Sequence, residues 1–130
     1  MLQIRNFWVG IDIENISRFK KFTNDRNNSF LHNIFTEDEL DFCFSKKVVA
    51  NHLAVRYAGK EASIKALCGI GLENIDYKDI EILSNINRVP IVRINNLNSN
   101  KIQARVSLSH CKDKALAFAV VMEFEVNGKN

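Results

Sequence analysis

The most constraining feature of the chain is a helical segment that carries a carboxylate among apolar residues. Residues 56–67 read R-Y-A-G-K-E-A-S-I-K-A-L and form the second part of a helix expected over residues 48–67. At about 100° per residue, Glu61 lies near the middle of an apolar face made of Ala50, Leu53, Ala54, Tyr57, Ile64 and Cys68. A buried carboxylate is costly unless it is paired, protonated or bound to a metal ion. The sequence therefore predicts a partner for Glu61.

The length and charge of the chain narrow the class of protein. A chain of 130 residues is long enough for one core but too short for two ordinary ones, so we expect a single domain over residues 1–130. The net charge of +3 suits an anionic substrate or partner, but nucleic-acid-binding proteins cluster Lys and Arg more densely. A small RNA- or DNA-binding protein ranks low, because the aromatics fall at core spacing in expected strands: Phe7, Trp8, Phe118 and Phe124.

The cysteines and the apolar runs indicate a cytoplasmic protein. Cys43, Cys68 and Cys111 are odd in number and lack C-x-x-C spacing, which is typical of reduced packing residues. No apolar run approaches the roughly 18 residues of a membrane span. Residues 1–5 lack the layout of a signal peptide. We therefore expect no membrane association.

The order of periodic segments predicts an α+β fold, in which an antiparallel sheet packs against a long helix and shorter helices. Thr36 and Glu39 form a capping box that starts a helix ending at residue 44 or 45. Glycines at 69 and 71 end the long helix. We expect a short helix over 15–23, a loop over 24–29 and strands over 7–13, 80–83, 90–94, 102–110 and 115–125. Turns at 95–100 and 111–114 would join the last three strands into a meander, and the first strand would join their sheet.

Two carboxylates are candidates for metal chemistry. Asp12 ends an apolar strand and Glu61 lies in an apolar helix face. Mg²⁺ typically takes one or two carboxylates together with phosphate oxygens and water. Asp12 is alternatively an N-cap or turn residue before the helix at Asn15. Glu61 is alternatively a surface partner of Lys65 at i+4.

Several further residues fit either ordinary structural roles or contacts with a phosphate. Arg56, Lys60 and Lys65 are solvated helix residues, or they neutralise oxygens of a pyrophosphate. His110 follows Ser109 at the end of a strand. It is either a core or edge histidine or a residue that donates a hydrogen bond to a phosphate. Ser109 and His110 point to opposite faces of a strand, and there is no G-x-S-x-G elbow, which disfavours a serine hydrolase. The glycines after residue 68 form neither a P-loop nor a Rossmann fingerprint, and no His/Cys cluster suggests zinc.

Taken together, the motifs resemble those of one enzyme family. The holo-[acyl-carrier-protein] synthases, small bacterial-type members of the 4′-phosphopantetheinyl transferase superfamily, share their order and spacing across nearly the whole chain. The matching segments are G-I-D-I at 10–13, F-T-E-D-E-L at 35–40, the helical segment at 56–67, D-I-E-I at 79–82, Pro90 and V-S-L-S-H at 106–110. The R-x-x-x-K-E-A-x-x-K-A pattern is the most specific of these. The resemblance implies a 4′-phosphopantetheinyl transferase fold.

The resemblance also implies a reaction and a set of site residues. The 4′-phosphopantetheine arm of coenzyme A would move to a serine of apo acyl carrier protein, in support of fatty acid biosynthesis, and adenosine 3′,5′-bisphosphate would leave. Asp12 and Glu61 match Mg²⁺ ligands, and Glu61, Lys65 and His110 match catalytic or phosphate-contacting residues. The expected contacts with coenzyme A come from Arg56, Lys60, Lys65, Gly69, Ser109 and His110.

The family pattern further implies a homotrimer with active sites between subunits and a basic surface for the carrier. Arg18 matches an arginine that meets the acidic recognition helix of the carrier, and Lys21 and Arg26 would extend that surface. Two segments depart from the pattern: C-G-I at 68–70 where G-T-G is common, and the nearly uncharged stretch 29–33 where arginines are common. A non-catalytic protein that binds the carrier or coenzyme A remains an alternative, although the set of Asp12, Glu61, Lys65 and His110 speaks against it.

Overall fold

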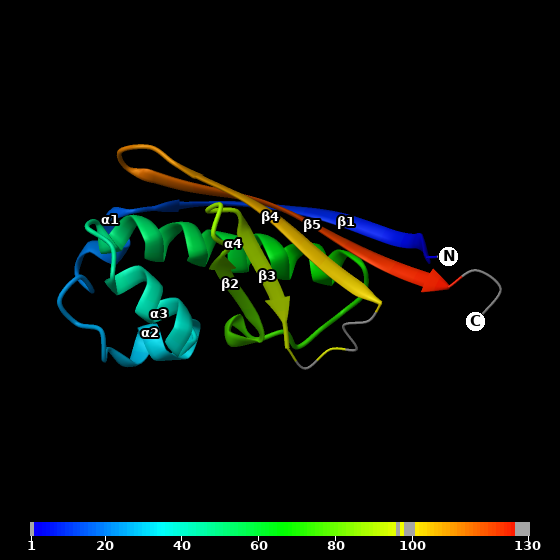
Figure 1. Cartoon of the computed structure of the whole chain (residues 1–130), viewed down its shortest axis with the longest axis horizontal. Coiled ribbons are helices and arrows are strands. Elements are labelled where there is room, and N and C mark those ends of the chain that lie inside the picture. The colour runs from blue at the N-terminus through cyan, green and yellow to red at the C-terminus, as the bar shows by residue number, and fades with distance from the viewer. Residues whose placement is uncertain (1, 96, 98–100, 127–130) are drawn as a thin grey trace.

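A long helix lies against one face of a three-stranded antiparallel sheet in the computed structural model, which describes residues 2–95, 97 and 101–126. The strand order is β1 (Leu2–Asn15), β5 (Lys114–Val126) and β4 (Ile102–His110), with β5 in the centre. Helix α4 (Val49–Gly69) runs along this sheet (Figure 1). The first and last strands of the chain are therefore neighbours in the sheet, with β1 at its edge.

Small side chains on β5 allow α4 to approach the sheet closely. Ala117 and Ala119 are fully buried and pack with Ala58 and Ala62 of the helix. Alanine has no side chain beyond Cβ, so the helix backbone comes nearer to the sheet than larger residues would permit. The alternation along β5 leaves its other side chains on the opposite face of the sheet.

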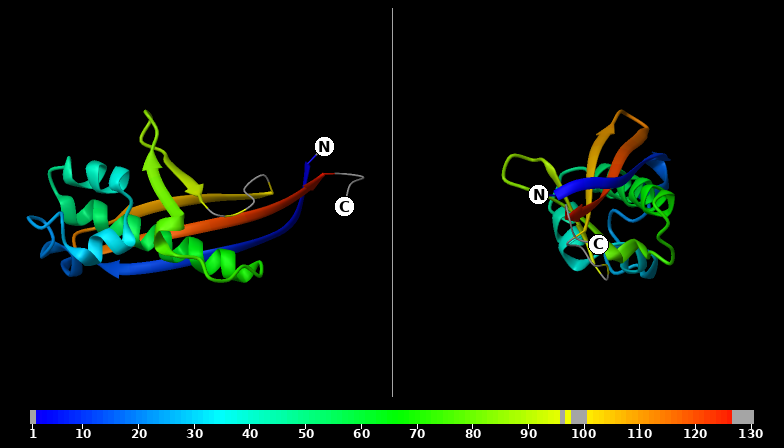
Figure 2. Two further views of the ribbon diagram at one scale, coloured as in Figure 1. Left: turned by 90° about the horizontal axis from the view of Figure 1, so that it is seen from below. Right: turned by 90° about the vertical axis from the view of Figure 1, so that its right-hand side faces the viewer.

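Three short helices gather at one end of the molecule, opposite the start of β1 and the end of β5 (Figures 1 and 2). They are α1 (Ser17–Lys20), α2 (Ser29–Ile34) and α3 (Glu37–Phe44). Their apolar residues share a buried cluster with the first half of α4; the fully buried members include Phe19, Leu31, Phe35, Leu40 and Leu53. This cluster anchors the end of β1 against α4.

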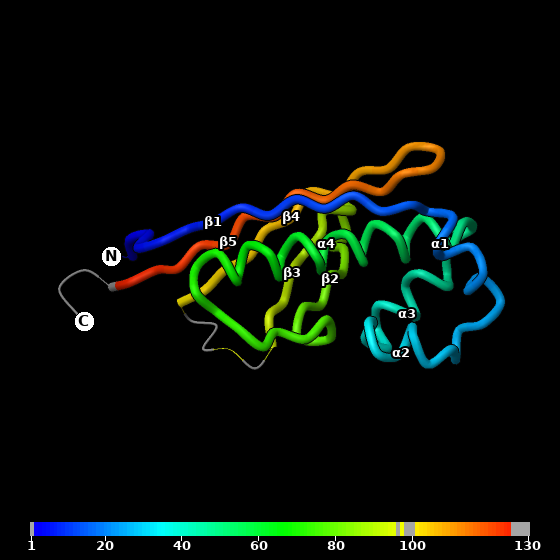
Figure 3. The backbone as a smooth tube through the Cα atoms, turned by 180° about the vertical axis from the view of Figure 1, so that it is seen from behind, coloured from blue at the N-terminus to red at the C-terminus, as the bar shows by residue number. Residues whose placement is uncertain are grey.

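A second, two-stranded sheet covers another side of α4 (Figure 3). The 3₁₀ helix η1 (Tyr77–Asp79) leads into β2 (Ile80–Ser84), which pairs with β3 (Pro90–Ile94). Ile80 and Ile82 are fully buried and pack with Leu67 of α4. As a result, α4 is enclosed between the two sheets and the short helices.

The structure confirms the predicted α+β class and most elements. The long helix, the helix that starts at the Thr36–Glu39 capping box and all the expected strands are present, and the first strand pairs with the last. Gly71 follows the long helix with φ at +98°, in the region that glycine tolerates best. No helix in the described part of the chain is both long and apolar enough to span a membrane.

Four predictions about the elements were wrong or incomplete. The helix expected over 15–23 is only Ser17–Lys20, and a helix, α2, follows the loop where none was expected. β3 pairs with β2 in a hairpin whose turn is closed by a hydrogen bond from the N–H of Asn85 to the carbonyl oxygen of Val89, and not in a meander with β4. The turn expected at 95–100 falls partly on residues outside the described ranges. The predicted apolar face of α4 is wrong toward its end, where Cys68 is exposed, because the neighbouring Leu67 is the residue that packs against β2.

Candidate active site

A close approach between β1 and α4 sets the position of Asp12. A Cβ placed on Gly10 would lie 1.9 Å from the carbonyl oxygen of Ala62, so no other residue fits at this contact without a shift. Asp12 follows two residues later on the same face of β1. Its Oδ1 lies 3.2 Å from Nζ of Lys65, and that nitrogen also donates to the carbonyl oxygen of Ile11 at 3.0 Å. The structure thus brings together Asp12 and Lys65, two residues that the sequence analysis singled out for different roles.

The second carboxylate oxygen of Asp12 has spare bonding capacity. Oδ2 is buried and has no hydrogen-bond partner among the described residues. A buried anionic oxygen without a donor is costly, and a bound cation relieves that cost. The described residues contain no cluster of three or more His, Cys, Asp or Glu that could hold a metal ion. The unpartnered Oδ2 of Asp12 is the kind of oxygen ligand that Mg²⁺ takes alongside phosphate and water.

Glu61 has a partner that the sequence analysis did not find. The hydroxyl of Tyr77 on η1 donates to Oε1 of Glu61 at 2.5 Å, and Glu61 is half-buried. This hydrogen bond raises the pKa of Tyr77 well above its usual value. Lys65 pairs with Asp12, so the alternative of a surface pair between Glu61 and Lys65 does not hold. The N-cap alternative for Asp12 also fails, because α1 has Ile16 at its N-cap and no side-chain cap.

A third carboxylate, Glu14, lies beside Asp12. Burial raises the pKa of Glu14 to about 7, and the neighbouring carboxylate of Asp12 acts in the same direction. Arg18 opposes this shift through an ion pair of 3.3 Å with Glu14. The strand period could have identified Glu14, since residues two apart share a face of a strand.

The interpretation of Arg56 and Lys60 as a basic stripe on the surface is corrected by their burial. Nζ of Lys60 is fully buried, pairs with Oε1 of Glu39 at 2.8 Å and donates to the carbonyl oxygens of Tyr77 and Ile80. Arg56 donates through Nε to the carbonyl oxygen of Ile82 at 3.1 Å and lies over the Phe42 ring. Burial lowers the pKa of Lys60, and the Glu39 carboxylate opposes that shift. Both cations serve the packing of α4 against neighbouring elements.

The remaining predicted residues for coenzyme A lie away from Asp12 within one subunit. His110 is exposed at the end of β4, and its Nδ1 lies 3.4 Å from the carbonyl oxygen of Cys111, a long hydrogen bond. β5 lies between β1 and β4, which separates the two edge strands by roughly 9–10 Å. Ser109 is exposed on the outer face of β4. Gly69 packs so closely on Trp8 that a Cβ there would lie 2.0 Å from the ring.

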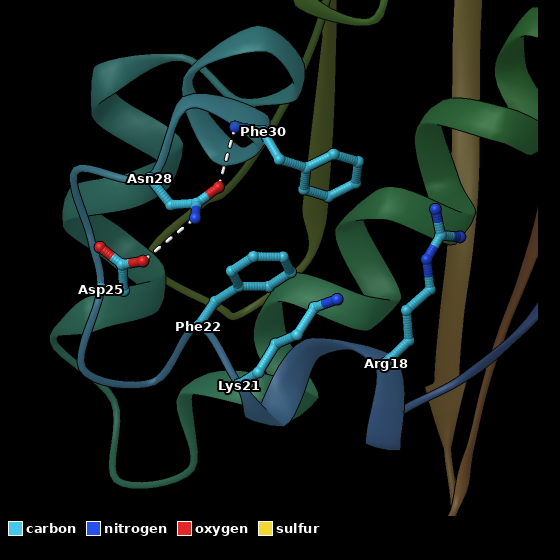
Figure 4. A pocket seen from close by; sticks show the side chains of 6 residues that line it. All are labelled: Arg18, Lys21, Phe22, Asp25, Asn28 and Phe30. Atoms are coloured by element: carbon cyan, nitrogen blue, oxygen red, sulfur yellow. Dashed lines mark hydrogen bonds between the residues drawn. The ribbon is translucent and has the colours of Figure 1, made fainter.

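Two of the three predicted carrier-binding residues, Arg18 and Lys21, line a hollow of about 440 Å³ beside α1 (Figure 4). It is lined by Arg18, Lys21, Phe22, Asp25, Asn28 and Phe30. The rings of Phe22 and Phe30 stack with centroids 5.4 Å apart, and the Arg18 guanidinium lies 5.6 Å from the centre of the Phe30 ring. Arg26 is not among the lining residues and pairs with Glu37 at 3.1 Å and Asp41 at 2.6 Å. The hollow thus combines an apolar floor with two cations.

Comparisons with known proteins agree with these motifs. Residues 8–121 match the family model of the 4′-phosphopantetheinyl transferase superfamily. The chain is 39% identical to a holo-[acyl-carrier-protein] synthase of Protochlamydia amoebophila (86% of this chain, 94% of that protein). It is 36% identical to one of Geobacter metallireducens (88% and 96%). A solved holo-[acyl-carrier-protein] synthase of Helicobacter pylori in complex with coenzyme A superposes with a TM-score of 0.72 at 29% identity (87% and 98%). The chain therefore belongs to the 4′-phosphopantetheinyl transferase superfamily and, within it, to the holo-[acyl-carrier-protein] synthases.

Proposed function

We propose that this chain transfers the 4′-phosphopantetheine arm of coenzyme A to a serine of apo acyl carrier protein, releasing adenosine 3′,5′-bisphosphate. Family membership supports the reaction class, and the H. pylori relative was solved with coenzyme A bound. The observation that carries the proposal is the unpartnered, buried Oδ2 of Asp12 beside Lys65 on α4. A cation and a diphosphate complement that arrangement.

Asp12 and Glu61 would hold Mg²⁺ at this site. When bound, the ion neutralises phosphate oxygens and polarises the phosphorus that the serine attacks. Lys65 has a side chain that is 55% exposed, so its ammonium can turn from Asp12 toward a phosphate oxygen. Asp12 is almost fully covered and keeps its carboxylate in one place. Asp12 thus anchors the site, and Lys65 moves onto the substrate.

The active site lies between subunits of a homotrimer in this proposal. The outer face of the three-stranded sheet exposes a continuous apolar surface, whose members are 40–61% exposed: Phe7, Val9, Ile11 and Ile13 of β1 with Leu116 and Phe118 of β5. An apolar face of this kind is typical of an interface, and two further copies of the chain would cover it. The separation of His110 from Asp12 also supports a shared site, in which His110 of one subunit faces the Asp12 of its neighbour.

The carrier docks at the hollow beside α1. Arg18 and Lys21 supply positive charge at its rim, while Phe22 and Phe30 offer an apolar contact. Acidic carrier proteins would be steered to such a surface. Arg26 contributes less, because Glu37 and Asp41 already neutralise it. We assign the reaction to the cytoplasm and to the supply of holo carrier for fatty acid biosynthesis.

The intact mass of apo acyl carrier protein tests this function. The carrier is incubated with the protein, coenzyme A and Mg²⁺, and a parallel sample contains EDTA. We expect the mass to rise by one phosphopantetheine in the first sample and to stay constant in the second. No mass gain with several unrelated carriers would contradict the proposal and favour a non-catalytic binder. A gain that persists in EDTA would contradict the role of the metal.

A further inference from the structure

Tyr77 holds one of the two oxygens of Glu61, and within the described part of the chain no hydrogen bond reaches the other. Its hydroxyl donates to Oε1 at 2.5 Å. A hydrogen bond to a charged carboxylate is among the stronger ones in proteins. Such a bond selects one orientation of the carboxylate plane, so Oε2 has a defined direction.

The ring of Tyr77 is itself fixed in place. It stacks on the ring of Tyr57, with centroids 5.5 Å apart and an interplanar angle of 25°. The two hydroxyls lie 3.5 Å apart, at the outer limit of a hydrogen bond. Tyr57 extends from α4, the helix that carries Glu61. The aromatic pair therefore ties η1 to the helix on the side of the site.

The backbone of Tyr77 is anchored by the buried ion pair of α4. Nζ of Lys60 donates to the carbonyl oxygen of Tyr77 at 3.0 Å and pairs with Glu39. Lys60 directly precedes Glu61 in the helix. The backbone contact from Lys60 and the hydroxyl contact to Glu61 thus form a closed link between η1 and one turn of α4. This link holds the phenol in position before any ligand arrives.

We propose that Tyr77 is a positioning residue for the metal site, because it orients Glu61 so that Oε2 is presented to the cation. This inference rests on the proposed function, since it concerns the ion that Asp12 and Glu61 would hold. Partners behind metal ligands typically change metal affinity by 10- to 100-fold when they are removed. Tyr77 does not touch the substrate in this role.

A pair of matched substitutions tests the proposal. Tyr77→Phe removes the hydroxyl next to Glu61 and keeps the stacked ring, while Tyr57→Phe removes the neighbouring hydroxyl in the same way. Binding of Mn²⁺ is titrated by the electron paramagnetic resonance signal of the free ion, with coenzyme A at saturation. We expect the Kd for Mn²⁺ to rise by about 10- to 100-fold in Tyr77→Phe. In Tyr57→Phe we expect a change of roughly threefold or less, because its hydrogen bond is long.

Turnover provides a second readout. If Tyr77 acts through metal affinity, Tyr77→Phe loses activity at low Mg²⁺ and recovers most of it at high Mg²⁺, which a general loss of structure would not produce. Both variants keep their aromatic packing, and equal thermal midpoints confirm that they are folded.

An unchanged Kd for Mn²⁺ in Tyr77→Phe would overturn the proposal, as would equal losses in the two variants. Either result, in a wild-type protein that binds Mn²⁺ and modifies its carrier, refutes the role of Tyr77 alone. Absence of Mn²⁺ binding and of carrier modification in the wild-type protein refutes the proposed function itself.

Discussion

Lys60 and Glu61 are neighbours on α4, yet one belongs to the core and the other to the site. The ammonium of Lys60 has three acceptors, in Glu39, Tyr77 and Ile80, which match its three donors. Among the described residues, Glu61 accepts one hydrogen bond, from Tyr77, and Asp12 has a buried oxygen that accepts none. A polar group whose bonds are all made stabilises a fold. A polar group with capacity left over is available to a ligand.

The largest expected effect comes from removing the spare oxygen. Asp12→Asn keeps the shape of the side chain, but it removes the negative charge and replaces one carboxylate oxygen by an amide NH₂ group. We expect turnover to fall by about 1,000-fold or more, since a metal ligand supplies several kcal/mol of transition-state stabilisation. The free energy of unfolding should change by about 1 kcal/mol or less. Steady-state kinetics and urea unfolding measure the two quantities. Near-normal turnover would show that Asp12 is not part of the site.

Lys60→Met should have the opposite effect, with a large loss in the free energy of unfolding and no direct effect on substrate binding. It leaves Glu39 buried without its cation, and breaking a buried pair in this way typically costs about 3–5 kcal/mol in the free energy of unfolding. Lys65→Met is the matched control on the same helix: its partly exposed ion pair should contribute about 1 kcal/mol or less to stability. Urea unfolding of both variants makes the comparison. If Lys60→Met unfolds like the wild-type protein but loses turnover, then Lys60 contacts the substrate after all.

The smallest expected effect lies at the carrier surface. Arg18→Ala should raise the KM for the carrier by about 5- to 10-fold and leave the KM for coenzyme A unchanged, because an arginine at a rim mainly affects association. Arg26→Ala should change the KM for the carrier by roughly twofold or less, since its charge is already paired. Kinetics at varied carrier concentration separate the two. Equal effects on carrier and coenzyme A would contradict a docking role for Arg18.

Local patterns predicted the elements better than the contacts between them. The capping box of Thr36 and Glu39 and the strand periods are set by neighbouring residues, and both are present. The burial of Lys60 depends on Glu39, 21 positions earlier in the chain. The orientation of the Glu61 carboxylate depends on Tyr77, 16 positions later. Periodicity within one helix contains no information about such partners. The helix α2 did have a local signal, because Asn28 caps it through Phe30.

The sequence predicted Asp12, Glu61 and Lys65 as site residues, and their role as metal and phosphate contacts stays a prediction, but it did not predict the side chains around them. Asp12 and Lys65 lie together because the contact of Gly10 with Ala62 brings β1 against α4, although the sequence had not paired them. Glu14 and Tyr77 were missed, although both lie beside the predicted carboxylates. Arg56 and Lys60 were misplaced because an amphipathic helix leaves one face to solvent, whereas α4 is enclosed between two sheets and the short helices.

Mixing two inactive variants tests most directly the claim that Asp12 and His110 of different subunits form one site. Asp12→Asn and His110→Ala are purified separately, unfolded, refolded together in equal amounts and assayed by carrier mass. In a ring of three, about one quarter of the interfaces then combine an intact Asp12 with an intact His110. We predict activity near a quarter of the wild-type rate from two inactive parents. Activity no higher than that of the parents would contradict a site shared between subunits.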